Sequence, residues 1–250
     1  MKLALLSDLH ANQLALEACI AHAAAQGAGR FAVLGDLVGY GAQPSQVVQR
    51  VRELAAAGAI VLQGNHDLLA VAPPPAIRTM DEAGASWTHG RLARDELSFL
   101  AGLPLTATDG ATFLVHASAD APRNWHYVDN PQRAESSLDA ACADPAVRRV
   151  FGGHVHRQTL YFRGSGRGLI PFLPTPGAAI PVPAHRRWIA TVGSVGQPRD
   201  GDPAAMYAMF DAARAELTFH RVAYDHLAAA ASVRAAGLPE FFAARLEQGR

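Results

Sequence analysis

Short apolar runs alternate with helix-like segments over the first quarter of the chain, and this alternation restricts the fold more than any other feature. Nearly continuous apolar runs are typical of strands buried on both faces, and strand–helix–strand order predicts parallel pairing with covering helices. The expected strands are residues 2–6, 30–34 and 59–62, and the expected helices are residues 11–26 and 44–57. We therefore predict an α/β fold that begins with a parallel sheet.

The rest of the chain predicts further strands with more antiparallel pairing. The expected strands are residues 111–115, 149–151, 158–162, 187–192, 206–211 and 216–223, the last two forming a hairpin. The expected helices are residues 77–101, 131–143 and most of the final 25 residues, and residues 120–130 are expected to form a loop. We predict two mixed sheets sharing one core, in a single domain over residues 1–250 with a helical cap-like segment at 77–101 over one side of a sheet.

The charge balance excludes several classes of partner. Lys and Arg number 22 and Asp and Glu also number 22, so the chain lacks the basic surface typical of nucleic-acid-binding proteins. No apolar run is long enough to span a bilayer, and the N-terminus lacks the pattern of a signal peptide. We expect a cytoplasmic protein with no membrane or nucleic-acid partner, in which Cys19 and Cys142 are buried thiols.

Polar side chains of one chemical kind follow five of the apolar runs. Each has an ordinary explanation by itself, since Asp8 could cap a helix, Asp36 could occupy a turn and His116 could be a core histidine. Together these explanations do not predict that all five strand ends carry such groups. The residues are Asp8 and His10, Asp36, Asn65 and His66, His116, and His154 and His156. In α/β sheets, ligands bind at the carboxyl ends of the strands, so we expect these side chains to converge.

Carboxylates, imidazoles and an amide oxygen without thiolates suit divalent ions such as Mn, Fe, Zn, Co or Ni and argue against a structural zinc site. Seven potential ligands exceed what one tetrahedral ion needs but suit two ions that share a bridge, for which Asp36 is the natural candidate. Paired ions stabilise the attacking and leaving oxygens of an in-line displacement at phosphorus. The composition of this set therefore predicts phosphoryl chemistry.

Five sequence blocks carry a family resemblance. Asp8-x-His10, Gly35-Asp36, Gly64-Asn65-His66-Asp67, His116 and Gly153-His154-x-His156 occur in the order of the motifs of the calcineurin-like metallophosphoesterase superfamily, which they resemble. The resemblance implies a four-layer αββα sandwich and two metal ions. It implies that Asp8, His10 and His156 hold the first ion, that Asp36 bridges, and that Asn65, His116 and His154 hold the second. His66 is expected to remain off the metals and to protonate the leaving oxygen, after attack by a metal-bridging hydroxide.

Two further features bear on the site. Asp67 could orient His66, although a helix-capping or turn role accounts for it equally well. Residues 192–203 resemble a block of the small prokaryotic phosphodiesterase-like branch, although Thr191-Val192 stand where Asn-Pro is common. In this block Ser194 could meet phosphate or could simply end a strand in a turn.

One absence narrows the substrate class. Protein serine/threonine phosphatases and symmetrical dinucleoside tetraphosphatases typically read Gly-Asp-x-x-Asp-Arg-Gly, whereas residues 35–41 here read Gly-Asp-Leu-Val-Gly-Tyr-Gly. The phosphate-gripping arginine of that motif is missing, and Arg123, Arg157 or Arg199 could replace it. His126 could line the mouth of the site or pack within its loop, and the other five histidines are expected at the surface: His22, His89, His185, His220 and His226.

The resulting hypothesis is a binuclear metal-dependent phosphoesterase, a phosphodiesterase or phosphatase, that acts on a small-molecule phosphoester. One alternative is a dinucleoside polyphosphate hydrolase. Another, from a different class, is a non-catalytic metal-binding scaffold, and the intact ligand set argues against it.

Overall fold

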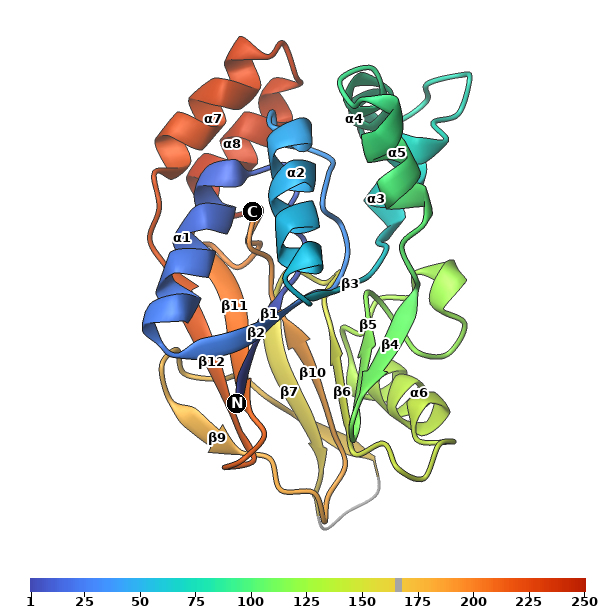
Figure 1. Ribbon diagram of the computed structural model, residues 1–250, viewed down its shortest axis with the longest axis vertical. Helices are drawn as coiled ribbons and strands as arrows, with labels where there is room; N and C mark the ends of the chain where they lie inside the picture. Colours follow the sequence, from blue (N-terminus) through green and yellow to red (C-terminus); the bar gives the residue numbers. More distant parts are fainter. Residues whose placement is uncertain (165–167) are drawn as a thin grey trace.

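The computed structural model describes residues 1–164 and 168–250, in which two mixed six-stranded sheets pack face to face (Figure 1). The first sheet has the order β3-β2-β1-β11-β12-β9, with β1 Lys2–Leu6, β2 Ala28–Val33, β3 Ile60–Val61, β9 Ala179–Pro181, β11 Ala205–Asp211 and β12 Glu216–Val222. The second has the order β4-β5-β6-β10-β7-β8, with β4 Thr106–Asp109, β5 Thr112–Val115, β6 Arg149–Gly152, β7 Gln158–Arg163, β8 Leu169–Phe172 and β10 Trp188–Val192.

Helices cover the outer faces of both sheets. Helices α1 and α2 pack on the first sheet, and α6 packs on the second (Figure 1). The helices are α1 Gln13–Ala25, α2 Pro44–Ala56, α3 Asn65–Val71, α4 Met80–His89, α5 Arg94–Ala101, α6 Pro131–Ala141, α7 His226–Ala235 and α8 Glu240–Gln248, with a short 3-10 helix at Pro122–Asn124. The predicted four-layer αββα sandwich is confirmed.

Alternation along β1 shows how the layers form. Leu3 and Leu5 lie in the core between the two sheets, whereas Ala4 and Leu6 lie in the core under α1 and α2. Successive side chains of a strand point to opposite faces, so an unbroken apolar run supplies both cores at once. The expected antiparallel second half is present only in part, because β5, β6 and β10 are parallel neighbours in the second sheet.

The helical segment predicted at 77–101 differs in position. It divides into α4, which packs against α3, and α5, which packs against α3 and α2. Leu92, between the two helices, and Leu100 on α5 share a core with the first sheet. Figure 1 shows both helices beyond the ends of the strands, next to α2, rather than over a sheet face. That residues 1–250 fold as one domain stays a prediction.

The sequence patterns did not predict three of the strands, β4, β8 and β9. Strand β4 forms a hairpin with β5 through the two-residue turn Gly110-Ala111, in which φ of Gly110 is 57°; a glycine at the first turn position is typical of such hairpins. Strands β8 and β9 lie at sheet edges, are short and contain proline, all of which weaken a strand pattern.

Other side-chain environments show one correction. His22, His220 and His226 are half-buried rather than on the surface. His22 Nδ1 is 2.7 Å from the Tyr207 hydroxyl, and His220 stacks on the Tyr207 ring. Cys19 and Cys142 are buried free thiols, as predicted. Within the described part of the chain, no helix is both long and apolar enough to cross a membrane.

The core between the sheets should dominate stability. Phe219 is fully buried there, so Phe219→Ala should lower the free energy of unfolding by about 3–5 kcal/mol, through lost burial and the resulting cavity. Urea unfolding would measure this change. Leu227→Ala is the matched control, because Leu227 is 59% exposed and its loss should change stability by no more than about 0.5 kcal/mol. Equal effects of the two substitutions would contradict this description of the core.

Candidate metal centre

The seven side chains proposed as ligands meet at one end of the two sheets. They follow parallel strands of both sheets, namely β1, β2 and β3 in the first and β5 and β6 in the second. The residues are Asp8, His10, Asp36, Asn65, His116, His154 and His156. Packing the sheets face to face brings His10 and His156, 146 positions apart in the chain, within 3.1 Å of each other.

The loops that carry these side chains are strained. The angle φ lies in the left-handed region at Asp8 (54°), His10 (47°), Asp36 (54°), His154 (66°) and His156 (59°). Such a conformation costs a non-glycine residue about 1–3 kcal/mol and persists only when the surroundings enforce it. Hydrogen bonds between the two loops of the first sheet do so: the Asp8 amide donates to the Gly35 carbonyl and the His10 amide donates to the Asp36 carbonyl, each at 3.0 Å.

Two glycines allow these loops to approach closely. A Cβ atom on Gly64 would overlap the Asp36 carboxylate, and one on Gly153 would overlap the side chains of Ser7 and Asp8. The glycines that precede Asn65 and His154 in the motifs are therefore needed for contact between loops from different strands.

The ligand atoms form two neighbouring clusters. Asp8, His10 and His156 make one triad, and Asp36, His116 and His154 make the other, each with its nitrogen and oxygen atoms within 4.8 Å of one another. Asp36 Oδ2 lies 3.9 Å from His10 Nε2 and 3.3 Å from His116 Nε2, so this oxygen faces both triads.

Hydrogen bonds at the far side of three rings fix their orientation. The Nδ1 atoms of His10, His116 and His156 lie 3.2, 2.8 and 2.6 Å from the carbonyl oxygens of Val38, Leu34 and Gln197. A carbonyl only accepts, so each Nδ1 carries a proton and each Nε2 faces the centre. In the neutral rings of His10 and His156 that Nε2 presents a lone pair. Backbone or carboxylate partners of this kind are usual for metal-ligating histidines.

The unsatisfied atoms of the centre fit a pair of cations. With Nδ1 protonated in both rings, His10 Nε2 and His156 Nε2 present two lone pairs to each other at 3.1 Å, which repel unless a cation lies against them. His154 Nε2 is buried and has no hydrogen-bond partner among the described residues. Asn65 Oδ1 lies 3.1 Å from His116 Nε2 and adds an amide oxygen to the second triad. Oxygen and imidazole donors of this kind suit divalent transition metals.

Comparison with known proteins agrees with this geometry. The model of the calcineurin-like phosphoesterase superfamily domain matches residues 1–215. The chain belongs to the calcineurin-like phosphoesterase superfamily. It is 35% identical to a metallophosphoesterase from Sphaerobacter thermophilus, whose crystal structure matches with a TM-score of 0.89 over 100% of this chain and 99% of the other.

Two further relatives extend over the full length. An uncharacterized protein of Methanocaldococcus jannaschii is 30% identical over 255 residues, which cover 99% of this chain and 98% of that protein. A hypothetical protein from Pyrococcus horikoshii, 19% identical, has the same fold with a TM-score of 0.78 over 100% of this chain and 98% of its own. This superfamily member is therefore close to small prokaryotic metallophosphoesterases.

Burial and the charges within the triads together determine their protonation without metal. Burial alone would raise the pKa of Asp8 and Asp36, but the nearby histidines hold both carboxylates well below their usual range. Burial lowers the pKa of His10 and His156, and burial together with the charge of His116 lowers the pKa of His154 to about 4. His116 differs, because the Asp36 and Asp8 carboxylates overcome its burial and raise its pKa to about 9.

His66 lies beside the triads without joining them. Its ring centroid is 5.2 Å from that of His10 and 4.5 Å from that of Tyr40, and its backbone amide donates to Asp36 Oδ1 at 2.7 Å. The Asp67 carboxylate accepts from the backbone amides of Gly64, Leu37 and Val38. Asp67 thus caps the start of α3 and ties it to the loop after β2, which matches the capping alternative. Orientation of His66 by Asp67 stays a prediction.

The other candidates separate clearly. The Ser194 hydroxyl donates to the Asp8 carbonyl and accepts from the Gln197 amide. It therefore stabilises a buried turn, which is the structural role considered for it rather than contact with phosphate. Arg123 and Arg157 are exposed, whereas the Arg199 guanidinium lies 5.7 Å from the centroid of the Tyr40 ring beside the centre. His126 is half-buried in its loop, with a buried Nδ1 that has no partner among the described residues.

The sequence patterns missed aromatic residues around the ligands. Tyr127 is half-exposed and stacks on His154 with ring centroids 4.1 Å apart, and Tyr40 packs 4.6 Å from His10. Tyr127 is adjacent to His126 in a loop already considered for the site mouth, but no periodicity or spacing pointed to either tyrosine as a site residue.

Metal loading should release a proton. In the metal-free protein His116 is charged below about pH 9 and shares its Nε2 proton with Asp36 and Asn65, where a cation would need the lone pair. Adding Mn²⁺ at about pH 7.5 should displace about one proton per chain, and affinity should rise with pH up to about 9. Calorimetry in two buffers of different ionisation enthalpy would count the protons. Metal binding without proton release would contradict this assignment.

Proposed function

We propose that this chain is a binuclear metal-dependent phosphoesterase that hydrolyses a small-molecule phosphoester. The observation that carries the proposal is the pair of buried triads, in which inward lone pairs face one another and one carboxylate oxygen faces both triads. In the proposal Asp8, His10 and His156 hold one ion, Asn65, His116 and His154 hold the other, and Asp36 contacts both. When bound, such ions supply Lewis-acid activation of water and neutralise charge on the phosphoryl oxygens.

The chain's own residues perform the remaining tasks. Backbone carbonyls at Val38, Leu34 and Gln197 hold three imidazoles with Nε2 directed toward the centre, so the rings need little reorientation when ions bind. The hydrogen bond from the His66 amide to Asp36 places the His66 imidazole next to the centre. From there it can hand a proton to the leaving oxygen, which is general acid catalysis.

Metal content and hydrolysis together test the proposal. The purified chain, loaded with Mn²⁺, Fe²⁺, Co²⁺, Ni²⁺ or Zn²⁺, should bind two ions and hydrolyse bis-p-nitrophenyl phosphate. Two ions without hydrolysis of any phosphomonoester, diester or dinucleotide would instead support the non-catalytic scaffold. Failure to bind two ions would overturn the proposal.

Asp36→Asn should lose both metal and activity. The substitution keeps the shape of the side chain but removes the charge that the proposal gives to both ions, and it leaves His116 without its main partner. We expect fewer than two ions per chain by elemental analysis and a fall of at least about 100-fold in kcat/KM, in line with the large cost of disturbing a metal site. An Asp36→Asn protein with two ions and full activity would refute the bridging role.

His66→Ala should lower turnover while two metals remain bound. A positioned general acid contributes about 10²–10⁴-fold, and most where the leaving group is a poor one. We therefore expect a loss at least tenfold larger for a diester with an alkyl alcohol leaving group than for bis-p-nitrophenyl phosphate, whose phenolate leaves without help. His185→Ala is the matched control, because His185 is exposed and precedes β10, at the opposite end of the strands. Equal losses for both substrates would mean that His66 acts only structurally.

A further inference from the structure

A pair of arginines from distant parts of the chain meets beside the metal centre. Arg199 lies in the loop that follows β10, and Arg245 lies on α8. Both donate to the same oxygen, Gln197 Oε1: Arg199 from Nη2 at 3.0 Å and Arg245 from Nη1 at 3.4 Å. Neither the proposed ligand set nor the proposed proton transfer uses these two residues.

The pair lacks a counter-ion. No carboxylate of the described residues lies within 4.0 Å of either guanidinium, whereas Arg221 and Arg234 each contact carboxylates directly. Burial, and then the charge of Arg199, lowers the pKa of Arg245. The charge of Asp81 on α4 acts on Arg245 in the opposite direction, but only from beyond ion-pair distance. Two half-buried like charges therefore share one neutral acceptor.

A third donor at this place is also unsatisfied. Two arginines fix the Gln197 amide oxygen, so its Nε2 is the donor end, and this buried atom has no acceptor among the described residues. A buried donor without an acceptor costs about 1–3 kcal/mol. The two guanidinium groups thus share one neutral oxygen and the amide N–H₂ group has no acceptor, so an anion would supply what all three lack.

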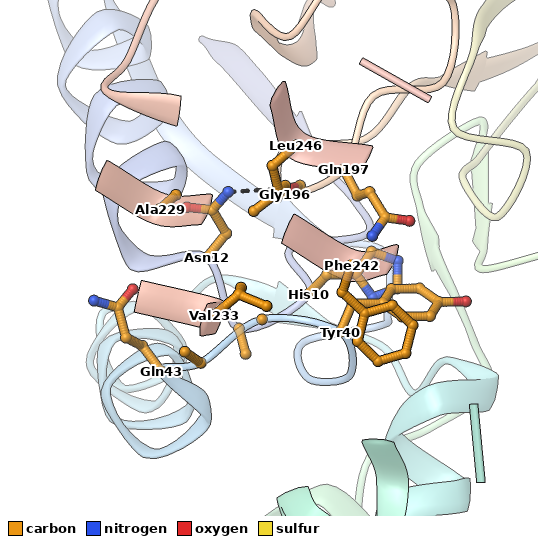
Figure 2. Close-up of a pocket in the computed structure, with 13 residues that line it drawn as sticks. His10, Asn12, Tyr40, Gln43, Gly196, Gln197, Ala229, Val233, Phe242 and Leu246 are labelled. Atoms are coloured by element: carbon orange, nitrogen blue, oxygen red, sulfur yellow. Dashed lines mark hydrogen bonds between the residues drawn. The ribbon is translucent and has the colours of Figure 1, made fainter. Parts of the chain in front are cut away.

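The pair lies on the His66 side of the centre. Arg199 covers the ring of Tyr40, and Tyr40 packs against both His10 and His66. The backbone carbonyl of Gln197 orients His156. Figure 2 shows the Gln197 side chain reaching toward His10 and Tyr40, with which it lines one small cavity under α7 and α8. An anion held by the arginines would therefore lie next to the group that leaves, if His66 is the proton donor.

We propose that Arg199 and Arg245 bind a second phosphate, on the leaving side of the scissile phosphoester. Guanidinium groups bind phosphate oxygens in a two-pronged manner, which suits this anion. The preferred substrates are then nucleotides or related esters with two phosphates, such as a nucleoside diphosphate or a dinucleoside polyphosphate. This inference deepens the proposed hydrolase function and rests on it. Arg245 lies beyond the matched superfamily domain, so the C-terminal helices contribute this specificity.

The proposal is tested by measuring, with calorimetry, the affinity of the Mn²⁺-loaded protein for two matched ligands. AMP carries one phosphate, and α,β-methylene-ADP carries two with an anhydride position that resists cleavage. The wild-type protein should bind the diphosphate at least tenfold more tightly than AMP. Arg199→Gln and Arg245→Gln should each reduce this preference at least tenfold, because each removes a charged donor to the second phosphate.

Arg214→Gln is the control, because it is the same substitution at an arginine that pairs with Glu216 at the β11–β12 turn. It should keep the full preference for the diphosphate over AMP. Circular dichroism and thermal melting would check the fold of each variant, and Arg199→Gln keeps the test valid if Arg245→Gln disturbs α8. A wild-type protein without preference, an unchanged preference in both variants, or an equal loss for both ligands would each overturn the proposal. Binding is measured apart from turnover, so a failure of hydrolysis is recognised separately.

Discussion

The structure depends on the approach of two histidine lone pairs that would repel each other without a cation. His10 comes from the first sheet and His156 follows a strand of the second, and their Nε2 atoms lie 3.1 Å apart because carbonyl oxygens hold the protons on the opposite ring atoms. This arrangement is unfavourable by itself, so the protein keeps it only through rigid surroundings. The ligands are therefore already arranged for metal when the protein has folded, and metal binding does not have to bring them together.

The surroundings that keep it rigid are mostly backbone. Five ligand residues occupy the left-handed region, and hydrogen bonds between the loops after β1 and β2 hold two of them there. Gly64 and Gly153 let further loops approach where any side chain would collide. The cores beneath these loops are continuous and apolar, so they tolerate strain above them. Apolar packing beneath the strand ends therefore supplies stability, while the strained polar loops beyond the strand ends carry the candidate site.

Around this centre the chain supplies groups outside the five sequence blocks that carry the proposed ligands. Tyr127 stacks on His154, Tyr40 lies between His10 and the Arg199 guanidinium, and Arg245 reaches in from the last helix. The match to the superfamily domain covers residues 1–215, and the C-terminal helix pair lies outside that match. In related folds, chemistry commonly stays with the scaffold while specificity changes through elements outside it.

Much of the scaffold was readable without coordinates. Continuous apolar runs specified buried strands, and polar residues of one kind after five of them indicated a shared site, because local patterns depend on neighbours in the chain. Edge strands β8 and β9 and helix α3 escaped, since short or proline-containing segments carry little periodicity. The sequence by itself thus determined the two-sheet class and the kinds of ligand atoms. The family resemblance also implied how the ligands divide and that Asp36 lies between them. Only the tertiary structure decided the distances within and between the triads, and that Arg199 and Arg245 meet at Gln197. These are relations between residues far apart in the chain, and face-to-face packing of the sheets creates them.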